Sequence, residues 1–110
     1  MPEAVSKRPS AKETLKMILA RLDDMKAEDS VTTDLTGKST IGDFMIVTSG
    51  RSNVHVAAIA DNLVKDLKGA GVTGIRVEGL RQGGWVLIDA GDVIAHVFRP
   101  LTARLEAADR

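Results

Sequence analysis

The 110-residue sequence contains no cysteine, and this absence excludes three kinds of chemistry. Without cysteine there is no disulfide framework, no thiol nucleophile and no cysteine-based zinc site. The composition suits a reducing cytosol, and residues 1–9 lack the apolar centre of a signal peptide. No apolar run reaches the length of a transmembrane helix. We therefore expect a cytoplasmic protein that makes no membrane contact.

Aromatic residues and net charge are also scarce. Phe, Trp and Tyr make up 3% of the chain, and 15 Lys and Arg balance 15 Asp and Glu. A protein held mainly by nucleic-acid phosphates needs a basic surface, so the balanced charge disfavours a dominant direct contact with nucleic acid, although a local basic patch remains open. A hydrophobic content of 44% is ordinary for a globular protein. We expect residues 10–110 to form one domain behind a disordered tail of residues 1–9.

Hydrophobic periodicity predicts two long helices. Ser10 and Glu13 form a capping box, and apolar residues then recur at helical spacing, which predicts a helix over residues 11–27. Ser52 can cap a second helix, which Gly69 or Gly71 ends. A short final helix is expected to begin at Pro100.

Between and after these helices the pattern predicts five strands. They cover residues 30–35, 44–48 and 74–78 and the two arms of a hairpin within residues 84–98. Because Phe44 to Thr48 is apolar throughout, we expect this strand to be covered on both faces. The last three strands are joined by short loops and should be antiparallel. The prediction is an α/β (α+β) fold, a mixed five-stranded sheet with helices packed on it.

The hairpin is the most informative segment, since it holds the only Trp and one of the two His residues. A two-residue turn at Ala90-Gly91 would set its register. The facing pairs would then share one side of the sheet: Asp89 with Asp92, Leu87 with Ile94, and Trp85 with His96. A face that mixes Trp, His, aliphatic residues and carboxylates is typical of a protein-contact surface. The opposite face, from Val86 to Val97, is plain core.

Two glycine-rich segments resemble nucleotide-binding motifs without their context. Gly37-Lys38-Ser39-Thr40 resembles the end of a P-loop, but Thr32 stands where the first glycine belongs and a strand follows. The segment Gly69 to Gly74 matches G-x-G-x-x-G, but it follows a helix and precedes a strand, the reverse of a dinucleotide site. A polar turn and a helix end are the simpler interpretations.

Catalytic interpretations stay open but weakly supported. Asp89 and Asp92 could form a carboxylate pair for a metal or for acid–base chemistry, although Asp89 could equally bond its own turn. His55 and His96 alone make a poor zinc set. A serine nucleophile beside His96 lacks the G-x-S-x-G turn at each candidate: Ser39, Ser49 and Ser52.

Four segments together resemble a known family. They are Asp34 to Phe44, Thr48-Ser49-Gly50, Arg76-Val77-Glu78-Gly79 and Trp85 to Phe98, and they occur in the family's order within residues 11–101. On these segments the chain is identified as similar to the ribosomal silencing factor family, also called Iojap-like proteins.

The resemblance implies a nucleotidyltransferase-like fold without the catalytic acids, and neither a Gly-Ser dipeptide nor an Asp-x-Asp triplet occurs here. It implies no enzymatic activity, cofactor or metal. It implies a cytoplasmic protein, often a homodimer, that binds the large ribosomal subunit through its fourteenth ribosomal protein. Bound there, such a protein blocks the small subunit and lowers translation when nutrients are short. The chain departs from the family in lacking Tyr and Trp over residues 103–110 and in having Val54 at an often basic position.

From face and family together we predict a partner-binding surface made of Trp85, Leu87, Asp89, Arg76, Glu78 and Lys38. The sequence leaves open whether Trp85 anchors the core or is exposed to a partner. Two other hypotheses remain. One is a residual nucleotidyl transferase that uses Asp89, Asp92 and a divalent metal. The other is a general RNA-binding module, which the balanced charge disfavours.

Overall fold

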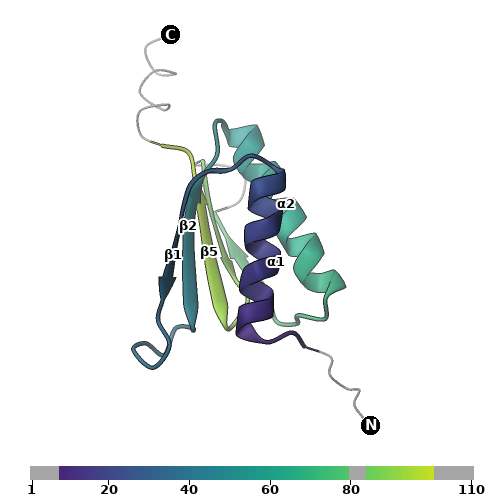
Figure 1. Ribbon diagram of the computed structural model, residues 1–110. Helices are drawn as coiled ribbons and strands as arrows, with labels where there is room; N and C mark the ends of the chain where they lie inside the picture. Colours follow the sequence, from purple (N-terminus) through teal and green to yellow (C-terminus); the bar gives the residue numbers. More distant parts are fainter. Residues whose placement is uncertain (1–7, 80–83, 101–110) are drawn as a thin grey trace.

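The computed structural model describes residues 8–79 and 84–100 and consists of one sheet with two helices packed on it (Figure 1). The helices are α1 (Ala11–Asp24) and α2 (Asn53–Gly69). The strands are β1 (Glu28–Asp34), β2 (Phe44–Ser49), β3 (Arg76–Glu78), β4 (Trp85–Asp89) and β5 (Val93–Phe98). Neither helix of this described part is long and apolar enough to cross a membrane. The predicted α+β class and five-stranded mixed sheet are confirmed, and the expected helix after Pro100 lies outside the described residues.

The strands lie in the order β1-β2-β5-β4-β3. β5 runs parallel to β2, while the other neighbouring pairs are antiparallel, as predicted for the last three strands. α2 leads from β2 to β3, which are separated in the sheet by β5 and β4. The β4–β5 hairpin therefore fills the gap that this crossover leaves.

Helix α1 has a complete cap at each end. The Ser10 Oγ accepts from the Glu13 N–H at 3.1 Å and the Glu13 carboxylate accepts from the Ser10 N–H at 2.9 Å, so the predicted capping box is confirmed. At the other end Lys26 has φ 60°, and the Ala27 N–H donates to the Leu22 carbonyl at 2.9 Å. This is a Schellman ending with Lys26 in the left-handed position that Gly usually takes. The helix therefore ends at Asp24, whereas the sequence predicted its end at residue 27.

Helix α2 begins and ends where the sequence predicts. The Ser52 Oγ accepts from the His55 N–H at 3.1 Å. Gly71 takes φ 96° just beyond the helix, and the Val72 N–H donates to the Leu67 carbonyl at 3.0 Å. The glycines of the G-x-G-x-x-G match thus end a helix and turn the chain, as expected.

The Gly37-Lys38-Ser39-Thr40 segment is a turn between β1 and β2. The Lys38 N–H donates to the Leu35 carbonyl at 2.8 Å, and the Ser39 Oγ accepts from the Ile41 N–H at 3.0 Å. The next element is a strand, whereas a P-loop must lead into a helix. The polar-turn interpretation is therefore confirmed.

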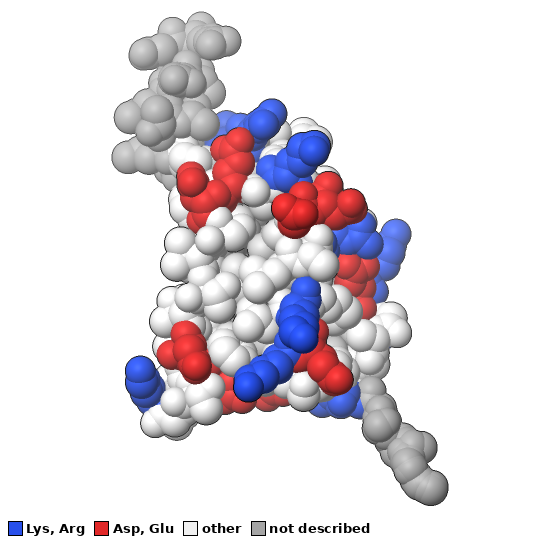
Figure 2. Space-filling view, in the orientation of Figure 1, with Lys and Arg blue, Asp and Glu red and all other residues white. Residues whose placement is uncertain are grey.

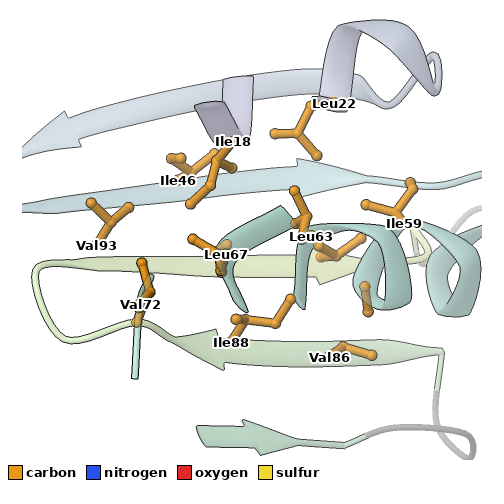
Figure 3. Packing of buried hydrophobic residues seen from close by; sticks show 14 of the residues in the cluster. Ile18, Leu22, Ile46, Ile59, Leu63, Leu67, Val72, Val86, Ile88 and Val93 are labelled. Carbon is orange, nitrogen blue, oxygen red and sulfur yellow. The ribbon is translucent and has the colours of Figure 1, made fainter. Parts of the chain in front are cut away.

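The core lies between the two helices and one face of the sheet. Figure 3 shows its side chains, which come from α1 (Ile18, Leu22), from α2 and its end (Ile59, Leu63, Leu67, Val72), and from the strands (Ile46, Val86, Ile88, Val93). The predicted core face of the hairpin is confirmed, because every member is buried: Val86, Ile88, Val93, Ala95 and Val97.

Strand β2 differs from its prediction on one face. Phe44, Ile46 and Thr48 are buried towards the helices, but Met45 and Val47 are only half-buried. The prediction of cover on both faces is wrong for the described residues, because α1 and α2 both pack on the same side. Both faces of β2 are therefore apolar in sequence, although helices cover only one of them.

The hairpin register is shifted by two residues from the prediction. Asp89 faces Ile94 and not Asp92, Leu87 faces His96, and Trp85 faces Phe98. The Ala90 N–H donates to the Val93 carbonyl at 3.0 Å, so the two turn residues are Gly91 and Asp92, one residue further along the chain than the predicted Ala90-Gly91 turn. A shift of two preserves the alternation, so each predicted strand residue keeps its face.

The loop position of Asp92 has a use in the fold. Its carbonyl accepts from the Asp43 N–H at 2.7 Å and from the Phe44 N–H at 3.1 Å, which joins the hairpin turn to the start of β2. A Cβ on Gly42 would lie 3.1 Å from the carbonyl oxygens of both Gly91 and Asp92. Gly42 thus permits the close approach of two loops that the parallel β2–β5 pair requires.

Arg8 holds the N-terminal segment against the same turn. Its Nη2 donates to the Ala90 carbonyl at 2.8 Å and its Nη1 to the Thr73 carbonyl at 3.4 Å. A Cβ on Gly91 would come within 2.9 Å of that Nη2, so a glycine leaves room for the guanidinium. Residues 1–7 of the expected tail lie outside the described part.

A two-pronged ion pair joins α1 to α2. The Arg21 Nε lies 2.7 Å from the Asp66 Oδ2, and the Arg21 Nη2 lies 2.9 Å from the Asp66 Oδ1. The hydrogen bond from Arg21 lowers the pKa of the Asp66 carboxyl below its ordinary value, against a smaller opposing effect of burial. The fork geometry adds a directional contact between the two helices.

Candidate partner-binding surface

One face of the sheet carries no helix within residues 8–79 and 84–100. Both helices lie to the right of the sheet in Figure 1. Facing residues of paired strands point to the same side, so the registers define the opposite side. We call it the open face, and its members are Val31, Thr33, Met45, Val47, Ile94, His96, Phe98, Trp85, Leu87, Asp89, Arg76 and Glu78.

An aromatic cluster occupies one end of the open face. The Trp85 and His96 rings meet edge to face, with centroids 6.1 Å apart and planes at 86°. The His96 and Phe98 rings are 5.8 Å apart and tilted by 51°. Trp85 remains 41% exposed, so it packs on its neighbours and still presents ring surface. The structure therefore shows Trp85 partly exposed and not buried in the core.

Gly79 holds the Trp85 ring in place from the neighbouring chain segment. It has φ 84°, and a Cβ there would lie 2.6 Å from Cε3 and Cζ3 of the indole. The backbone after β3 thus passes directly against the ring, which any other residue would displace. The Arg76–Gly79 stretch and Trp85 form one structural unit.

Charged residues lie beside the aromatic cluster on β3 and β4. Arg76 faces Asp89 across the two strands, and Glu78 faces Leu87. Arg76 and Glu78 are exposed, while Leu87 and Asp89 are half-buried. The open face therefore has an apolar centre and a mixed-charge rim along the β3 edge, an arrangement common in protein–protein interfaces.

Lys38 lies apart from the other predicted contact residues. It belongs to the turn between β1 and β2, at the opposite edge of the sheet from β3. The structure brings five of the six predicted residues together on two adjacent strands, and it leaves Lys38 as a separate, exposed point.

The candidate serine nucleophiles all have structural partners. Ser52 caps α2 and Ser39 caps its own turn. The Ser49 Oγ donates to the Glu28 carbonyl at 3.0 Å. These hydroxyls satisfy backbone groups, and none is bonded to His96.

His55 and Asp89 also have structural partners. His55 Nδ1 accepts from the Arg51 N–H at 3.0 Å and its Nε2 lies 2.8 Å from the Met25 carbonyl, so it joins two loops. Asp89 accepts from the Gly91 N–H at 2.8 Å, the turn-bonding role considered from the sequence. No cluster of three or more His, Asp or Glu side chains suited to a metal occurs in the described residues.

The chain also resembles proteins that are already known. Residues 8–104 match the family described as "Ribosomal silencing factor during starvation". The chain belongs to the ribosomal silencing factor family. The resemblance inferred from the four sequence segments is thereby confirmed.

Individual relatives agree with the family assignment. Ribosomal silencing factor RsfS of Zymomonas mobilis is 45% identical over 86 residues, which span 78% of this chain and 65% of the relative, just under two thirds of its length. RsfS of Halalkalibacterium halodurans is 43% identical over 81% of this chain and 76% of its own length. A crystal structure of a Chromobacterium violaceum protein superimposes with a TM-score of 0.79 at 36% identity, covering 91% of this chain and 83% of that one.

The family assignment also bears on the hypothesis that the protein is an enzyme. A silencing factor is a regulator, and the family description names no reaction. Of the groups considered for catalysis, Ser39, Ser49, Ser52 and Asp89 are engaged in capping, turn and backbone bonds. Membership and geometry together favour a binding protein.

Some residues of the open face were not singled out from the sequence. Met45, Val47 and Val31 belong to it, and Val31 is 58% exposed. Their alternation was visible, but their side of the sheet depends on β5 lying between β2 and β4. Such a non-local pairing has no signal in a single sequence.

Proposed function

We propose that this protein binds the large ribosomal subunit and sterically blocks the small subunit from joining it, which represses translation when nutrients are limiting. The observation that carries the proposal is the open face, an apolar and aromatic sheet surface with a charged rim, in a chain of the ribosomal silencing factor family. Steric occlusion requires only a stable placement, so the protein needs no cofactor, metal or turnover. The same reasoning makes it a non-enzymatic protein of the cytoplasm, where ribosomes work.

The contact we propose is with the fourteenth protein of the large subunit. Trp85 is the anchor, since Trp is among the residues enriched at hot spots and this one is partly packed and still 41% exposed. Leu87 extends its apolar surface, and Arg76, Glu78 and Asp89 set the orientation through charge. Lys38 would touch the partner only at the far edge of the footprint. The balanced net charge suits a protein contact better than one made wholly to RNA.

We also propose that the free protein forms a homodimer, as the resemblance implies. Light scattering of the purified protein at rising concentration tests this directly. A mass that stays at one chain throughout would contradict it without touching the ribosome proposal.

The deciding experiment follows subunit association by light scattering, with large subunits incubated with the protein before small subunits are added. Association should fall with dose, and the protein should sediment with large but not with small subunits. Normal joining with no sedimentation would overturn the proposal. Joining that falls while the protein sediments with small subunits would overturn the proposed site of action.

Trp85→Ala tests the anchor in the same assay. Loss of a hot spot should cost more than about 1 kcal/mol, or at least roughly fivefold in affinity for large subunits. Val54→Ala is the matched control, since Val54 is 79% exposed but lies on α2, away from the open face. Circular dichroism and denaturation must show Trp85→Ala folded. If the folded variant binds as the unchanged protein does, Trp85 is not the anchor.

A further inference from the structure

The outer edge of β1 has features that the open face does not account for. β1 is the first strand of the sheet, and all seven of its residues are exposed. Its centre, from Ser30 to Thr33, is uncharged, and three of these four residues are β-branched. Glu28, Asp29 and Asp34 lie at its ends, and the Glu28 Oε2 is 3.1 Å from the Arg51 Nε. Where Figure 1 draws β1, Figure 2 shows uncharged surface between acidic groups above and below it.

The hydrogen-bond pattern shows which backbone groups of β1 remain for another strand. The Leu35 N–H donates to the Asp43 carbonyl at 2.7 Å, in register with the β1–β2 pairs. Backbone groups alternate in direction along a strand, so those of Val31 and Thr33 also point to β2. The N–H and C=O of Thr32 therefore point outward from the sheet.

The opposite edge of the sheet is protected along its whole length, and β1 is not. β3 has only three residues, and two of them are charged. Short length and charge are the usual means of preventing edge pairing. β1 has a bulge at Asp29 and Ser30, where the register shifts and Asp29 takes φ 53°, but its stretch from Val31 to Asp34 pairs regularly with β2. That stretch contains no Lys or Pro.

We propose that the edge of β1 accepts an extended strand from a protein partner whose own strand has an uncharged centre and basic residues at both ends. Backbone bonds to Thr32 give the pairing its strength, and the acids at each end of β1 select the charge of the partner. The proposal concerns an edge distinct from the open face and goes beyond the proposed function, since it is independent of whether the partner is ribosomal.

Charge decides against two other occupants. A second copy of β1 in parallel register would place its three acids beside the same three acids, and an antiparallel copy in full overlap would set Glu28 against Asp34 at both ends, which is unfavourable across a strand pair. Nucleic-acid phosphates would meet the same acidic ends. The basic ends of the proposed partner strand would instead be attracted to the acids at the ends of β1.

Titration of the full-length protein with a short blocked peptide tests the proposal. The peptide has an alternating valine–threonine centre and lysines at both ends, and its counterpart has glutamates in their place. We expect the lysine peptide to shift the amide resonances of residues 31–34 and to bind at least about tenfold tighter than the glutamate peptide. Equal binding of the two peptides, or none at millimolar concentration, would overturn the proposal.

Thr32→Pro tests the backbone contact. Proline removes an N–H that points away from β2, so the strand is retained while the outward bond is lost. Thr32→Val is the matched control, since it changes the side chain and keeps the N–H. We expect Thr32→Pro to weaken peptide binding at least about tenfold and Thr32→Val to leave it unchanged. Unweakened binding of the peptide to folded Thr32→Pro would contradict the pairing. Self-association of the protein that Thr32→Pro abolishes would also contradict the proposal, because it would assign the edge to a second copy of this chain.

Discussion

At the scale of single residues, two non-glycine residues within 8–79 and 84–100 lie in left-handed backbone. Lys26 ends α1 with φ 60° and Asp29 begins the β1 bulge with φ 53°. Such conformations carry a steric cost for residues with a Cβ, least for Asn and Asp. Lys26 is therefore the more strained of the two, and a substitution there is the better candidate for stabilising the fold.

Lys26→Gly should raise the free energy of unfolding by about 0.5–1 kcal/mol. Relief of the left-handed penalty exceeds the added chain entropy of glycine in the unfolded state. Urea denaturation at neutral pH measures the difference. Lys16→Gly, at an exposed position inside α1, is the control and should lower stability by about 1 kcal/mol. A loss of stability in both variants would mean that the Lys26 side chain contributes more than its backbone strain costs.

At the scale of elements, the sequence predicted the starts of α1 and α2, the end of α2 and the faces of the hairpin strands correctly, but it did not predict the register of the hairpin. Ser10 with Glu13, Ser52 and Gly71 each marked a helix end, because a cap is a contact between near neighbours in sequence. The hairpin faces were also predictable, because alternation survives a shift of two residues. The position of the turn was not, because it depends on Asp92 bonding to the start of β2, a contact between distant segments.

The same division applies to the candidate surface. Five of the six predicted residues share the open face because they come from β4 and from the adjacent β3. Lys38 was included from the family resemblance, and the strand order separates it from the others. Met45 and Val47 were missed because the choice of face for β2 follows from its pairing with β5.

The contact between α1 and α2 gives the fold a pH dependence. Since Arg21 lowers the pKa of Asp66 in the folded state, the carboxylate contributes stability above its ordinary pKa near 3.8 and loses it as the pH falls through the lower folded value. Asp66→Asn should therefore lower the urea midpoint at pH 7, and its deficit should shrink in acid below that ordinary pKa. Denaturation of both proteins across this range measures it. A deficit that is constant with pH would show that the ion pair does not couple to folding.

At the scale of the whole molecule, the charge balance predicts how binding responds to salt. A protein held by many phosphate contacts loses about a thousandfold or more in affinity between 50 and 200 mM salt. With 15 basic and 15 acidic residues and an apolar open face, this protein should lose less than about tenfold in affinity for large subunits over that range. Sedimentation at several salt concentrations measures the slope. A steep slope, together with binding to naked ribosomal RNA, would favour the RNA-binding hypothesis.

The strand order also constrains when the molecule can form. β5 follows the other four strands in sequence, yet it lies in the middle of the sheet, with Phe44 of β2 paired to Val93. Until residues 93–98 have been synthesised, β1–β2 and β3–β4 are two hairpins with no strand between them. Pairings of such long range form late and slowly. A nascent chain of this protein therefore closes its sheet only after Phe98 has been added, on the kind of particle that we propose its finished form to silence.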